Sequence, residues 1–356
     1  MTEKSILSVR DLKTYFFMDE GVVKAVDGVS FDVNAGQIFG IVGESGCGKS
    51  VTMKAMLRIV EPPGRIVGGQ ILLRQTSKGD KSADGPMIDL TKLDANGKEM
   101  RAIRGAEIAL IPQEPMAAFS PVHTIGDQIV EAIMLHQDVD KHEGRKIALQ
   151  MLKDVGIPIP EQRLDEYSWQ LSGGLRQRAI IAMALSCNPR ILIADEPTTA
   201  VDVTTQAQVL RLLRNLQEQR NAAIIFITHD LGVIAQMASY VMVMYLGLVM
   251  EEGPVDEIYH SPQHPYTQAL LRSIPNVNST PRVDLPTISG SIPHPFNKPK
   301  GCPFHPRCIK AMPGKCDVRT PVLLPVGDKQ LASCFLYHDE DAESQSHVAA
   351  PKVPVQ

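Results

Sequence analysis

Short apolar runs alternate with longer segments of helical periodicity through much of the chain. Four of these runs are rich in β-branched residues: 37–42, 108–111, 191–194 and 223–228. Strands that are buried on both faces form continuous apolar runs, and strands that alternate with helices form parallel sheets. The pattern therefore predicts an α/β fold built around a mostly parallel sheet.

The two ends of the chain follow other patterns. Residues 7–12 and 22–33 are β-rich and partly alternate apolar with polar positions, which predicts a small antiparallel sheet beside the main one. Residues 74–99, rich in Gly, Asp, Lys and Ser, predict a surface loop or hairpin insertion. Residues 339–356 lack apolar periodicity, which predicts a disordered tail.

Composition narrows the class of protein. The 356 residues are 44% apolar and 21% charged, which is typical of a globular chain, and the net charge of −4 argues against a nucleic-acid partner. No apolar stretch approaches the roughly 20 residues of a membrane helix, so we expect any membrane role to be peripheral. Six cysteines and no apolar leader predict a cytosolic chain. Prolines and cysteines crowd beyond residue 254, which predicts a second module there.

A glycine-rich segment predicts a phosphate-binding loop. Residues 43–50 match G-x-x-x-x-G-K-[ST] and lie between an apolar strand and a helical segment, which makes a chance glycine turn a weak alternative. Backbone N–H groups and the N-terminus of the following helix attract phosphate. Lys49 is predicted to meet the β- and γ-phosphates of ATP, and Ser50 to bind Mg²⁺. The predicted nucleotide contacts of this segment are Gly43, Glu44, Ser45, Gly46, Cys47, Gly48, Lys49, Ser50 and Val51.

Two carboxylates follow the apolar run 190–194. Asp195 and Glu196 are costly at the end of a buried strand unless a cation lies nearby, and Mg-ATP supplies one. We predict that Asp195 holds the metal through water and that Glu196 polarises the water that attacks the γ-phosphate. The alternative is a pair of acids that caps a strand at the surface.

Residues 171–178, Leu-Ser-Gly-Gly-Leu-Arg-Gln-Arg, resemble the signature motif of ATP-binding cassette (ABC) ATPases. The resemblance covers residues 5–255 and implies the P-loop ABC fold and ATPase activity. It also implies a head-to-tail dimer, in which ATP lies between the P-loop of one subunit and the signature of the other. Ser172, Gly173 and Gly174 at the start of a helix form an anion site that suits this donation in trans. Leu175 departs from the family pattern, which has Gln at that position.

Further motifs of the same family follow along the chain. Gln113 resembles the Q-loop glutamine, Asp202 ends a D-loop-like sequence at 200–202, and His229 resembles the switch histidine. The resemblance implies that Gln113 binds Mg²⁺ and water and that His229 contacts the γ-phosphate. Tyr15 resembles the aromatic residue that stacks on adenine. Phe16 is the rival for that role, and a tyrosine of the core or of an edge strand is the alternative.

Residues 261–275, which contain His-Pro-Tyr-Thr, resemble the C-terminal extension of dipeptide and oligopeptide importer ATPases. The resemblance implies a peripheral subunit on the cytoplasmic face of the inner membrane. Its implied partners are a second homologous ATPase, expected to form a heterodimer, two membrane permeases and an extracytoplasmic solute-binding protein. The segment 114–119 corresponds to the permease-docking segment of the family, with a simple surface loop as the alternative. The transported solute is selected by the other subunits.

These motifs predict a division of the chain. Residues 1–255 form the ABC domain, with a helical subdomain at about 114–180, and residues 256–338 form the extension that precedes the tail. Two other classes of protein are alternatives to the importer. A soluble ABC ATPase in translation or DNA repair is disfavoured because such proteins usually carry two cassettes or a long coiled-coil insertion, and this sequence has neither. An electron-transfer protein is disfavoured because the single metal cluster that the importer resemblance implies gives no path for electrons.

Four cysteines of the extension form the most unusual pattern. Cys302, Cys308, Cys316 and Cys334 lie among prolines that bend the chain, which in a cytosolic chain suits thiolate ligation of a metal better than disulfides. A zinc site usually contains C-x₂₋₄-C, which this sequence lacks, although zinc and unliganded thiols stay open as alternatives. The resemblance to the importer subfamily implies a 4Fe–4S cluster at these four positions.

Overall fold

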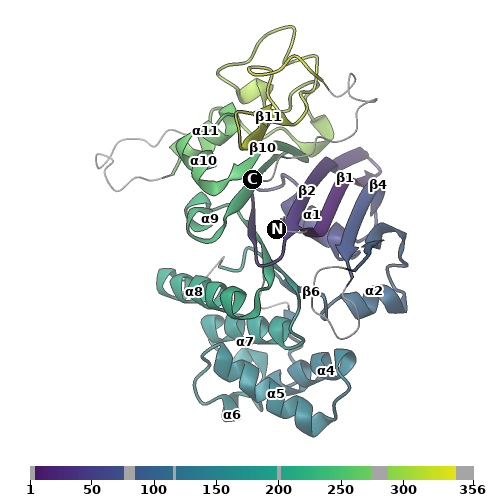
Figure 1. Cartoon of the computed structure of the whole chain (residues 1–356), viewed down its shortest axis with the longest axis vertical. Coiled ribbons are helices and arrows are strands. Elements are labelled where there is room, and N and C mark those ends of the chain that lie inside the picture. Colours follow the sequence, from purple (N-terminus) through teal and green to yellow (C-terminus); the bar gives the residue numbers. More distant parts are fainter. Residues whose placement is uncertain (1–4, 76–84, 115–117, 199–201, 275–287, 342–356) are drawn as a thin grey trace.

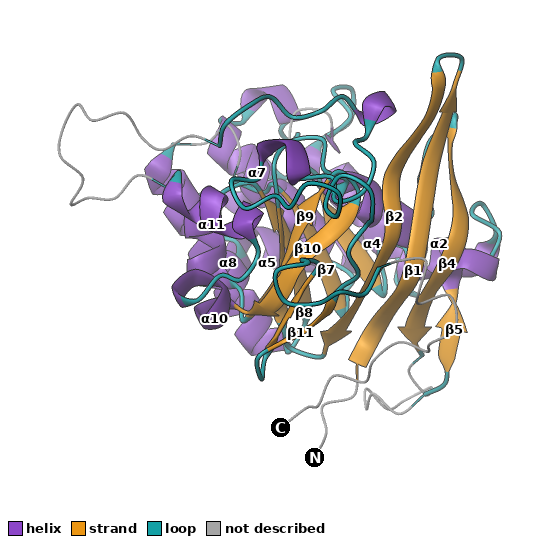
Figure 2. Ribbon diagram, turned by 90° about the horizontal axis from the view of Figure 1, so that it is seen from above, coloured by secondary structure: helices purple, strands orange, loops and turns teal. Residues whose placement is uncertain are grey.

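Two sheets organise the molecule, described here by a computed structural model over residues 5–75, 85–114, 118–198, 202–274 and 288–341. The smaller sheet is antiparallel, with strand order β2-β1-β4-β5. Its strands are β1 (Ser5–Met18), β2 (Gly21–Asn34), β4 (Gly64–Arg74) and β5 (Met87–Asp89). In Figure 2 this sheet stands beside the main sheet, as the alternating pattern of the first forty residues predicts.

The main sheet has eight strands in the order β11-β12-β10-β9-β3-β8-β7-β6. The four apolar runs found in the sequence are its strands β3 (Ile38–Val42), β6 (Ile108–Ile111), β7 (Ile191–Asp195) and β8 (Ala223–Thr228). These strands pair in parallel, and their buried side chains contribute to apolar cores on both faces of the sheet. The predicted α/β fold is therefore confirmed.

Helices connect the parallel strands and form one end of the molecule. In Figure 1, α4 to α7 lie together at the end opposite the C-terminal elements. The helices are α1 (Lys49–Met56), α2 (Lys98–Ile103), α4 (Ile125–His136), α5 (Lys141–Asp154), α6 (Pro160–Arg163), α7 (Gly173–Leu185), α8 (Val203–Arg220), α9 (Leu231–Met237), α10 (Val255–His260) and α11 (Pro265–Arg272). Short 3₁₀ turns are η1 (Leu90–Lys92), η2 (Ser168–Gln170), η3 (Pro295–Asn297) and η4 (His305–Arg307). In the part of the chain that the structure describes, no helix is both long and apolar enough to cross a bilayer.

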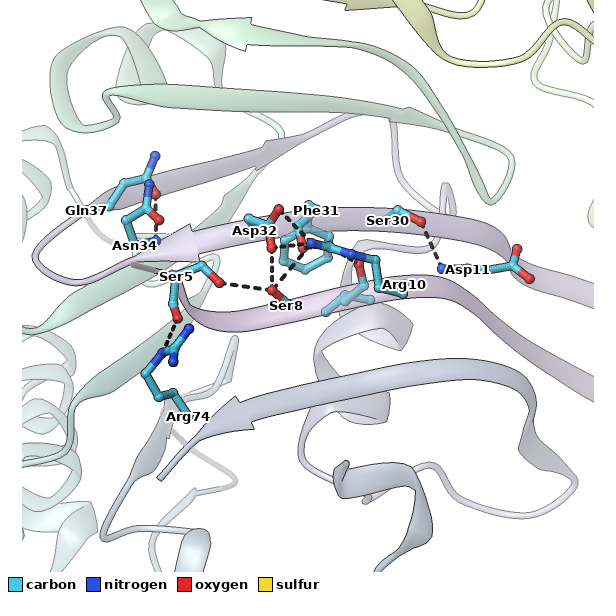
Figure 3. A network of polar contacts seen from close by, with 11 residues as sticks. Ser5, Ser8, Arg10, Asp11, Ser30, Phe31, Asp32, Asn34, Gln37 and Arg74 are labelled. Carbon is cyan, nitrogen blue, oxygen red and sulfur yellow. Dashed lines mark hydrogen bonds and ion pairs between the residues drawn. The ribbon is translucent and has the colours of Figure 1, made fainter. Parts of the chain in front are cut away.

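Polar side chains join β1 to β2, as Figure 3 shows. Arg10 donates from one terminal nitrogen to both carboxylate oxygens of Asp32, at 2.7 and 2.8 Å. Ser8 also donates to Asp32, and the Asp11 amide donates to the Ser30 hydroxyl at 2.8 Å. The ion pair is largely exposed, so its contribution to stability is modest. Its role is to fix the register of two long strands, one of which carries Tyr15.

The C-terminal extension continues the main sheet. Strand β9 (Tyr240–Tyr245) pairs with β10 (Leu248–Pro254), which pairs with β12 (Gln330–Ala332), and β12 pairs with β11 (Leu324–Val326). Side chains of the extension also enter the core that contains the helices: Tyr266, Cys302 and Phe304 belong to the same apolar cluster as Tyr245. The extension and the rest of the described chain therefore share one sheet and one core.

The remaining sequence expectations meet the structure in part. The insertion at 74–99 contains β5, which pairs antiparallel with β4, and the 3₁₀ turn η1, and α2 begins at its end; residues 76–84 lie outside the described residues. The start of the expected tail is engaged in contacts, because Asp341 pairs with Arg319 and Asp339 pairs with Lys315 at 2.5 Å. The rest of that tail, 342–356, lies outside the described residues.

Candidate nucleotide-binding site

Close backbone packing explains the glycines of the P-loop. The loop runs from the end of β3 to α1, which begins at Lys49 after Gly48 in a left-handed conformation, with φ of 107°. A Cβ atom on Gly48 would lie 2.3 Å from the carbonyl oxygen of Ala25, and one on Gly43 would lie 2.2 Å from that of Met244. Only glycine fits at these positions, because any side chain would meet backbone atoms. Tight loops of this kind can turn several backbone N–H groups toward a phosphate.

Lys49 lies inside this loop. Its side chain is buried, and its ammonium group donates to the carbonyl oxygens of Gly43 at 2.7 Å and of Glu44 at 3.1 Å. A buried ammonium group that is held by neutral carbonyls favours an incoming anion. The geometry therefore agrees with the predicted contact between Lys49 and the terminal phosphates. Cys47 has a pKa raised by burial, so the thiol predicted to contact nucleotide here is neutral.

Ser50 and Asp195 meet at the start of α1. The Ser50 hydroxyl donates to the Asp195 carboxylate at 3.2 Å, although the two residues are 145 positions apart. Burial raises the pKa of Asp195 above its ordinary value, and the neighbouring Glu196 adds to this effect. A divalent cation would reverse that shift, because it stabilises the carboxylate. The structure thus brings together a hydroxyl and a carboxylate that are suited to Mg²⁺.

Gln113, Glu196 and His229 converge beside this pair. They follow β6, β7 and β8, which are neighbours in the parallel sheet, so their carboxyl ends meet at one edge. The Gln113 amide donates to one oxygen of Glu196 at 3.2 Å, and Nδ1 of His229 lies 3.1 Å from the other oxygen. Glu196 has a φ of 48°, an uncommon left-handed conformation that often marks functional positions. Its roles and those of its neighbours stay predictions.

Tyr15 lies on β1 with its hydroxyl engaged. It donates to Asp27 at 2.6 Å, and Asp27 also pairs with Lys298 of the extension at 3.3 Å. Burial and this hydrogen bond raise the pKa of Tyr15, so the ring stays neutral. Phe16, the rival for the adenine contact, pairs with Gly64 of β4. Its ring packs so closely on this glycine that a Cβ atom on Gly64 would lie 2.6 Å from the ring. The hydroxyl of Tyr15 is thus held by Asp27, which is in turn held by Lys298.

The signature residues occupy another part of the chain. The Ser172 hydroxyl caps α7, accepting from the amide of Leu175 at 3.4 Å, and Gly173 has open space where a Cβ would stand. Helix α7 packs on α4, α5 and β6, whereas α1 packs on β1, β2 and β7. Asp202 caps α8 through Thr205, and residues 199–201 of the predicted D-loop lie outside the described residues, as do 115–117 of the predicted docking segment. Ser172 and Gly173 are exposed, and their donation to a second subunit stays a prediction.

The four cysteines of the extension surround one small cavity. Cys302, Cys308, Cys316 and Cys334 line a space of about 20 Å³, together with Phe304 and Phe335. Burial, reinforced by the neighbouring thiols, raises the pKa of Cys302 to about 12 and that of Cys334 to about 11. Across the residues that the structure describes, no three His, Cys, Asp or Glu side chains are close enough together to hold a metal ion.

Sequence reasoning missed two residues that touch the P-loop from the extension. Arg307 forms an ion pair with Glu44 at 2.7 Å, and the Tyr266 hydroxyl accepts from the Glu44 amide at 3.0 Å. Tyr266 belongs to the His-Pro-Tyr-Thr segment, which the sequence singled out only as a family motif. Arg307 had no signal at all, because an arginine among prolines is usually exposed.

Comparisons with known proteins agree with this geometry. Residues 26–199 match the model of the ABC transporter family, and residues 250–316 match that of the oligopeptide/dipeptide transporter C-terminal region. The chain belongs to the ABC transporter family. It is 46% identical over 341 residues to an oligopeptide transport ATP-binding protein of Bacillus subtilis, covering 95% of this chain and 99% of that protein. It is 42% identical over 336 residues to a dipeptide transport ATP-binding protein of Escherichia coli, covering 94% and 98%.

Solved structures support the same assignment. The dimeric structure of a post-hydrolysis state of an ATP-binding cassette with ADP and phosphate matches 70% of this ABC ATPase and 98% of the cassette, with a TM-score of 0.60 and 25% identity. The structure of cbiO1 from Clostridium perfringens, part of the ABC transporter complex cbiONQ, matches 73% of this chain and 92% of that chain, with a TM-score of 0.59 and 25% identity. The family, the P-loop fold and the ATPase activity predicted from the sequence are therefore confirmed. The domain boundaries and the individual site residues stay predictions.

Proposed function

We propose that this ABC ATPase drives the uptake of dipeptides or oligopeptides by hydrolysing ATP between two head-to-tail subunits. The observation that carries the ATPase half is the convergence of Gln113, Glu196 and His229 beside Ser50 and Asp195. The peptide half is supported by the extension matched at 250–316 and by relatives that are named as dipeptide and oligopeptide transport proteins.

Each residue of the site has a chemical task in this proposal. Ser50, Asp195 and Gln113 would hold Mg²⁺, which neutralises charge on the terminal phosphates. Lys49 binds the same phosphates. Glu196 accepts a hydrogen bond from the attacking water and so polarises it. The second subunit supplies Ser172, Gly173 and Gly174, whose helix start faces an anion across the interface, with Asp202 beside it.

His229 positions Glu196 and contacts the γ-phosphate in the same proposal. Its Nδ1 lies 3.1 Å from Glu196, and its side chain is 59% exposed, so that a nucleotide can reach the ring. Tyr15 stacks on adenine with its hydroxyl held by Asp27. The partner subunit is a homologous ATPase, and we infer a heterodimer.

An apolar surface patch supports docking to membrane subunits. Trp169 and Val122 are 63% and 72% exposed, and Trp169 stacks on Tyr167, whose backbone bridges to Thr124. Exposed aromatic groups that are gathered in this way mark protein contacts. We propose that two permeases dock on this face, so that the subunit lies on the cytoplasmic side of the inner membrane. An extracytoplasmic binding protein would deliver the peptide.

Reconstitution tests the import. The subunit is assembled with its permeases and its ATPase partner in liposomes, and ATP-dependent uptake of labelled dipeptides and tetrapeptides is measured. Uptake that is lost with Glu196→Gln and not with the surface substitution Glu131→Gln supports the proposal. Vigorous ATPase activity without peptide uptake by the complete assembly contradicts peptide as the substrate and leaves the ATPase assignment intact.

The four cysteines are proposed to hold a 4Fe–4S cluster, with Zn²⁺ as the alternative. All four thiols line one cavity walled by Phe304 and Phe335, which supports the proposal. They would have to draw closer together to share a metal, because no three of these described side chains lie within reach of one ion. A bound metal would take the place of the thiol protons that burial otherwise retains on Cys302 and Cys334. The amide of Met312 already donates to the sulfur of Cys316 at 3.4 Å, a contact that suits a thiolate. The group stabilises the fold of the extension.

Metal analysis separates the cluster from zinc. The protein is purified without oxygen, and iron, zinc and acid-labile sulfide are measured together with the visible absorption spectrum. Iron and sulfide in nearly equal amounts, lost in Cys308→Ser and kept in Cys187→Ser, support the cluster. A colourless protein that contains zinc and no iron reverses the assignment.

A further inference from the structure

The second residue of the P-loop is held by the C-terminal extension. Glu44 and Arg307 form a two-point ion pair: the terminal nitrogens of Arg307 lie 2.7 Å and 3.0 Å from the two carboxylate oxygens of Glu44. The side chain of Arg307 is 5% exposed and that of Glu44 is 20% exposed. Such paired geometry, shielded from water, fixes both position and direction of the carboxylate.

Arg307 is itself anchored by residues of the extension and by Tyr245 at the end of β9. Its Nε donates to the carbonyl oxygen of Ser289 at 3.2 Å, and one terminal nitrogen also donates to the hydroxyl of Tyr245 at 3.2 Å. The guanidinium group lies over the rings of Tyr245 and Phe304, 5.8 Å and 6.0 Å from their centres. Arg307 is therefore held in place by contacts other than Glu44, so that it can fix the position of the Glu44 carboxylate.

Tyr266 holds the backbone of the same residue. Its hydroxyl accepts a hydrogen bond from the Glu44 amide at 3.0 Å. The ring is fully buried and packs on Tyr245 and Phe304, with centres 4.8 Å and 5.2 Å apart. On the other side of the peptide, the carbonyl oxygen of Glu44 accepts from Lys49 at 3.1 Å. The Glu44 peptide is thus fixed between the extension and the phosphate-binding lysine.

We propose that Arg307 and Tyr266 are positioning residues of the ATP site, which hold the P-loop in its phosphate-binding shape from outside the loop. A loop that is ordered before ATP arrives loses less entropy on binding. The extension therefore sets the affinity for ATP, while the chemical step depends on Glu196 and its neighbours. The proposal rests on ATP binding alone, and is independent of what is transported.

Nucleotide binding by the full-length chain tests the proposal. The dissociation constant of a fluorescent ATP analogue is measured for Arg307→Gln, Arg307→Lys, Tyr266→Phe and Glu44→Gln. We expect Arg307→Gln to raise this constant by about tenfold or more, because it leaves a carboxylate without its partner. Tyr266→Phe removes one hydrogen bond and gives a smaller rise, and Arg307→Lys falls between them.

The double variant Arg307→Gln with Glu44→Gln separates positioning from general damage. Neither charge is left alone in it, so we expect it to recover much of the affinity that Arg307→Gln loses. For Arg307→Gln in the assembled ATPase, we expect the kcat at saturating ATP to stay within about twofold of the wild-type value while the KM for ATP rises. Arg319→Gln is the matched control, since Arg319 pairs with Asp341 in the same extension. Its affinity for ATP stays at the wild-type value.

Two results would overturn the proposal. One is that the single variants Tyr266→Phe and Arg307→Lys both fold and both keep the wild-type dissociation constant for ATP. The other is that Arg319→Gln also loses affinity for ATP, and that in all variants the loss of affinity follows the fall in melting temperature. The extension would then act on the ATP site only through the stability of the fold. If Arg307→Gln does not fold, the two conservative variants still decide the question.

Discussion

The side-chain amide of Gln113 lies 3.2 Å from a carboxylate oxygen of Glu196, across 83 residues of sequence. The other oxygen of Glu196 faces His229. Each oxygen of the proposed base therefore has a partner at the end of a neighbouring strand, which fixes the direction of the carboxylate. Because each carboxylate oxygen has two lone pairs, Glu196 can still accept a hydrogen bond from the attacking water.

The role of Glu196 is tested by its amide variant. We expect Glu196→Gln to lower the ATPase rate by about 100-fold or more, because an amide cannot polarise the attacking water. Binding of ATP stays intact, since no phosphate contact is removed. Phosphate release and equilibrium binding measure the two effects, and Glu131→Gln on α4 serves as the control. A rate close to that of the wild type would refute the assignment.

The contact between Ser50 and Asp195 predicts that a variant without the Ser50 hydroxyl needs more Mg²⁺ for ATPase activity. Ser50→Ala removes a hydroxyl that donates to Asp195 and that would bind Mg²⁺. We expect the Mg²⁺ concentration for half-maximal ATPase activity to rise by about tenfold or more. Titration of activity with Mg²⁺ at fixed ATP measures this, with Ser30→Ala on β2 for comparison. An unchanged titration curve would show that the hydroxyl takes no part in binding the metal.

The open space at Gly173 allows a test of action in trans. A methyl group there contacts nothing within 4 Å in its own chain, so we expect Gly173→Ala to change the free energy of unfolding by less than about 0.5 kcal/mol. In the proposed head-to-tail dimer the same methyl group would stand where the partner's nucleotide approaches, and we expect the ATPase rate to fall. Thermal unfolding, nucleotide binding by one subunit and steady-state hydrolysis are compared. Full activity of the assembled variant contradicts the head-to-tail arrangement.

Buried Glu252 predicts how stability depends on pH. Burial raises its pKa to about 8, and Asp32 nearby adds to the shift, while one carboxylate oxygen has no hydrogen-bond partner. The folded state therefore keeps a proton that the unfolded state releases above its ordinary pKa of 4.5. The stabilising effect of that proton is complete below pH 4.5 and is lost as the pH rises toward 8.

The variant Glu252→Gln removes this dependence. Between pH 5 and 8 we expect the wild type to lose about 1.4 kcal/mol of stability per pH unit relative to the variant. Chemical unfolding at several pH values measures the difference, with the exposed Glu131→Gln as a control that shows no such trend. A constant difference over this range would mean that Glu252 is ionised in the folded protein.

The parts of the site that are local in sequence could be predicted from it. The P-loop is one segment whose glycines, lysine and serine each have a physical reason, and Asp195 and Glu196 end a strand whose apolar run is continuous. Gln113 and His229 could be placed because they follow parallel strands, and such strands bring their carboxyl ends together.

The contacts of the extension could not be predicted in the same way. Arg307 and Glu44 are 263 positions apart, and no periodicity links a proline-rich segment to a glycine-rich loop. Strand β12 has three residues, too few to show an alternating pattern. A boundary drawn from proline content therefore separated two segments that fold against each other. Long-range pairing depends on the shape of the finished core, which composition does not encode.

Strand β11 gives the main sheet a protected edge. It is the outermost strand on the side of the extension, only three residues long, and its central residue Pro325 is exposed and has no backbone N–H to donate. Strand addition by a second chain is therefore disfavoured at this edge. By ending the main sheet in this way, the extension lowers the risk that copies of the chain aggregate through it.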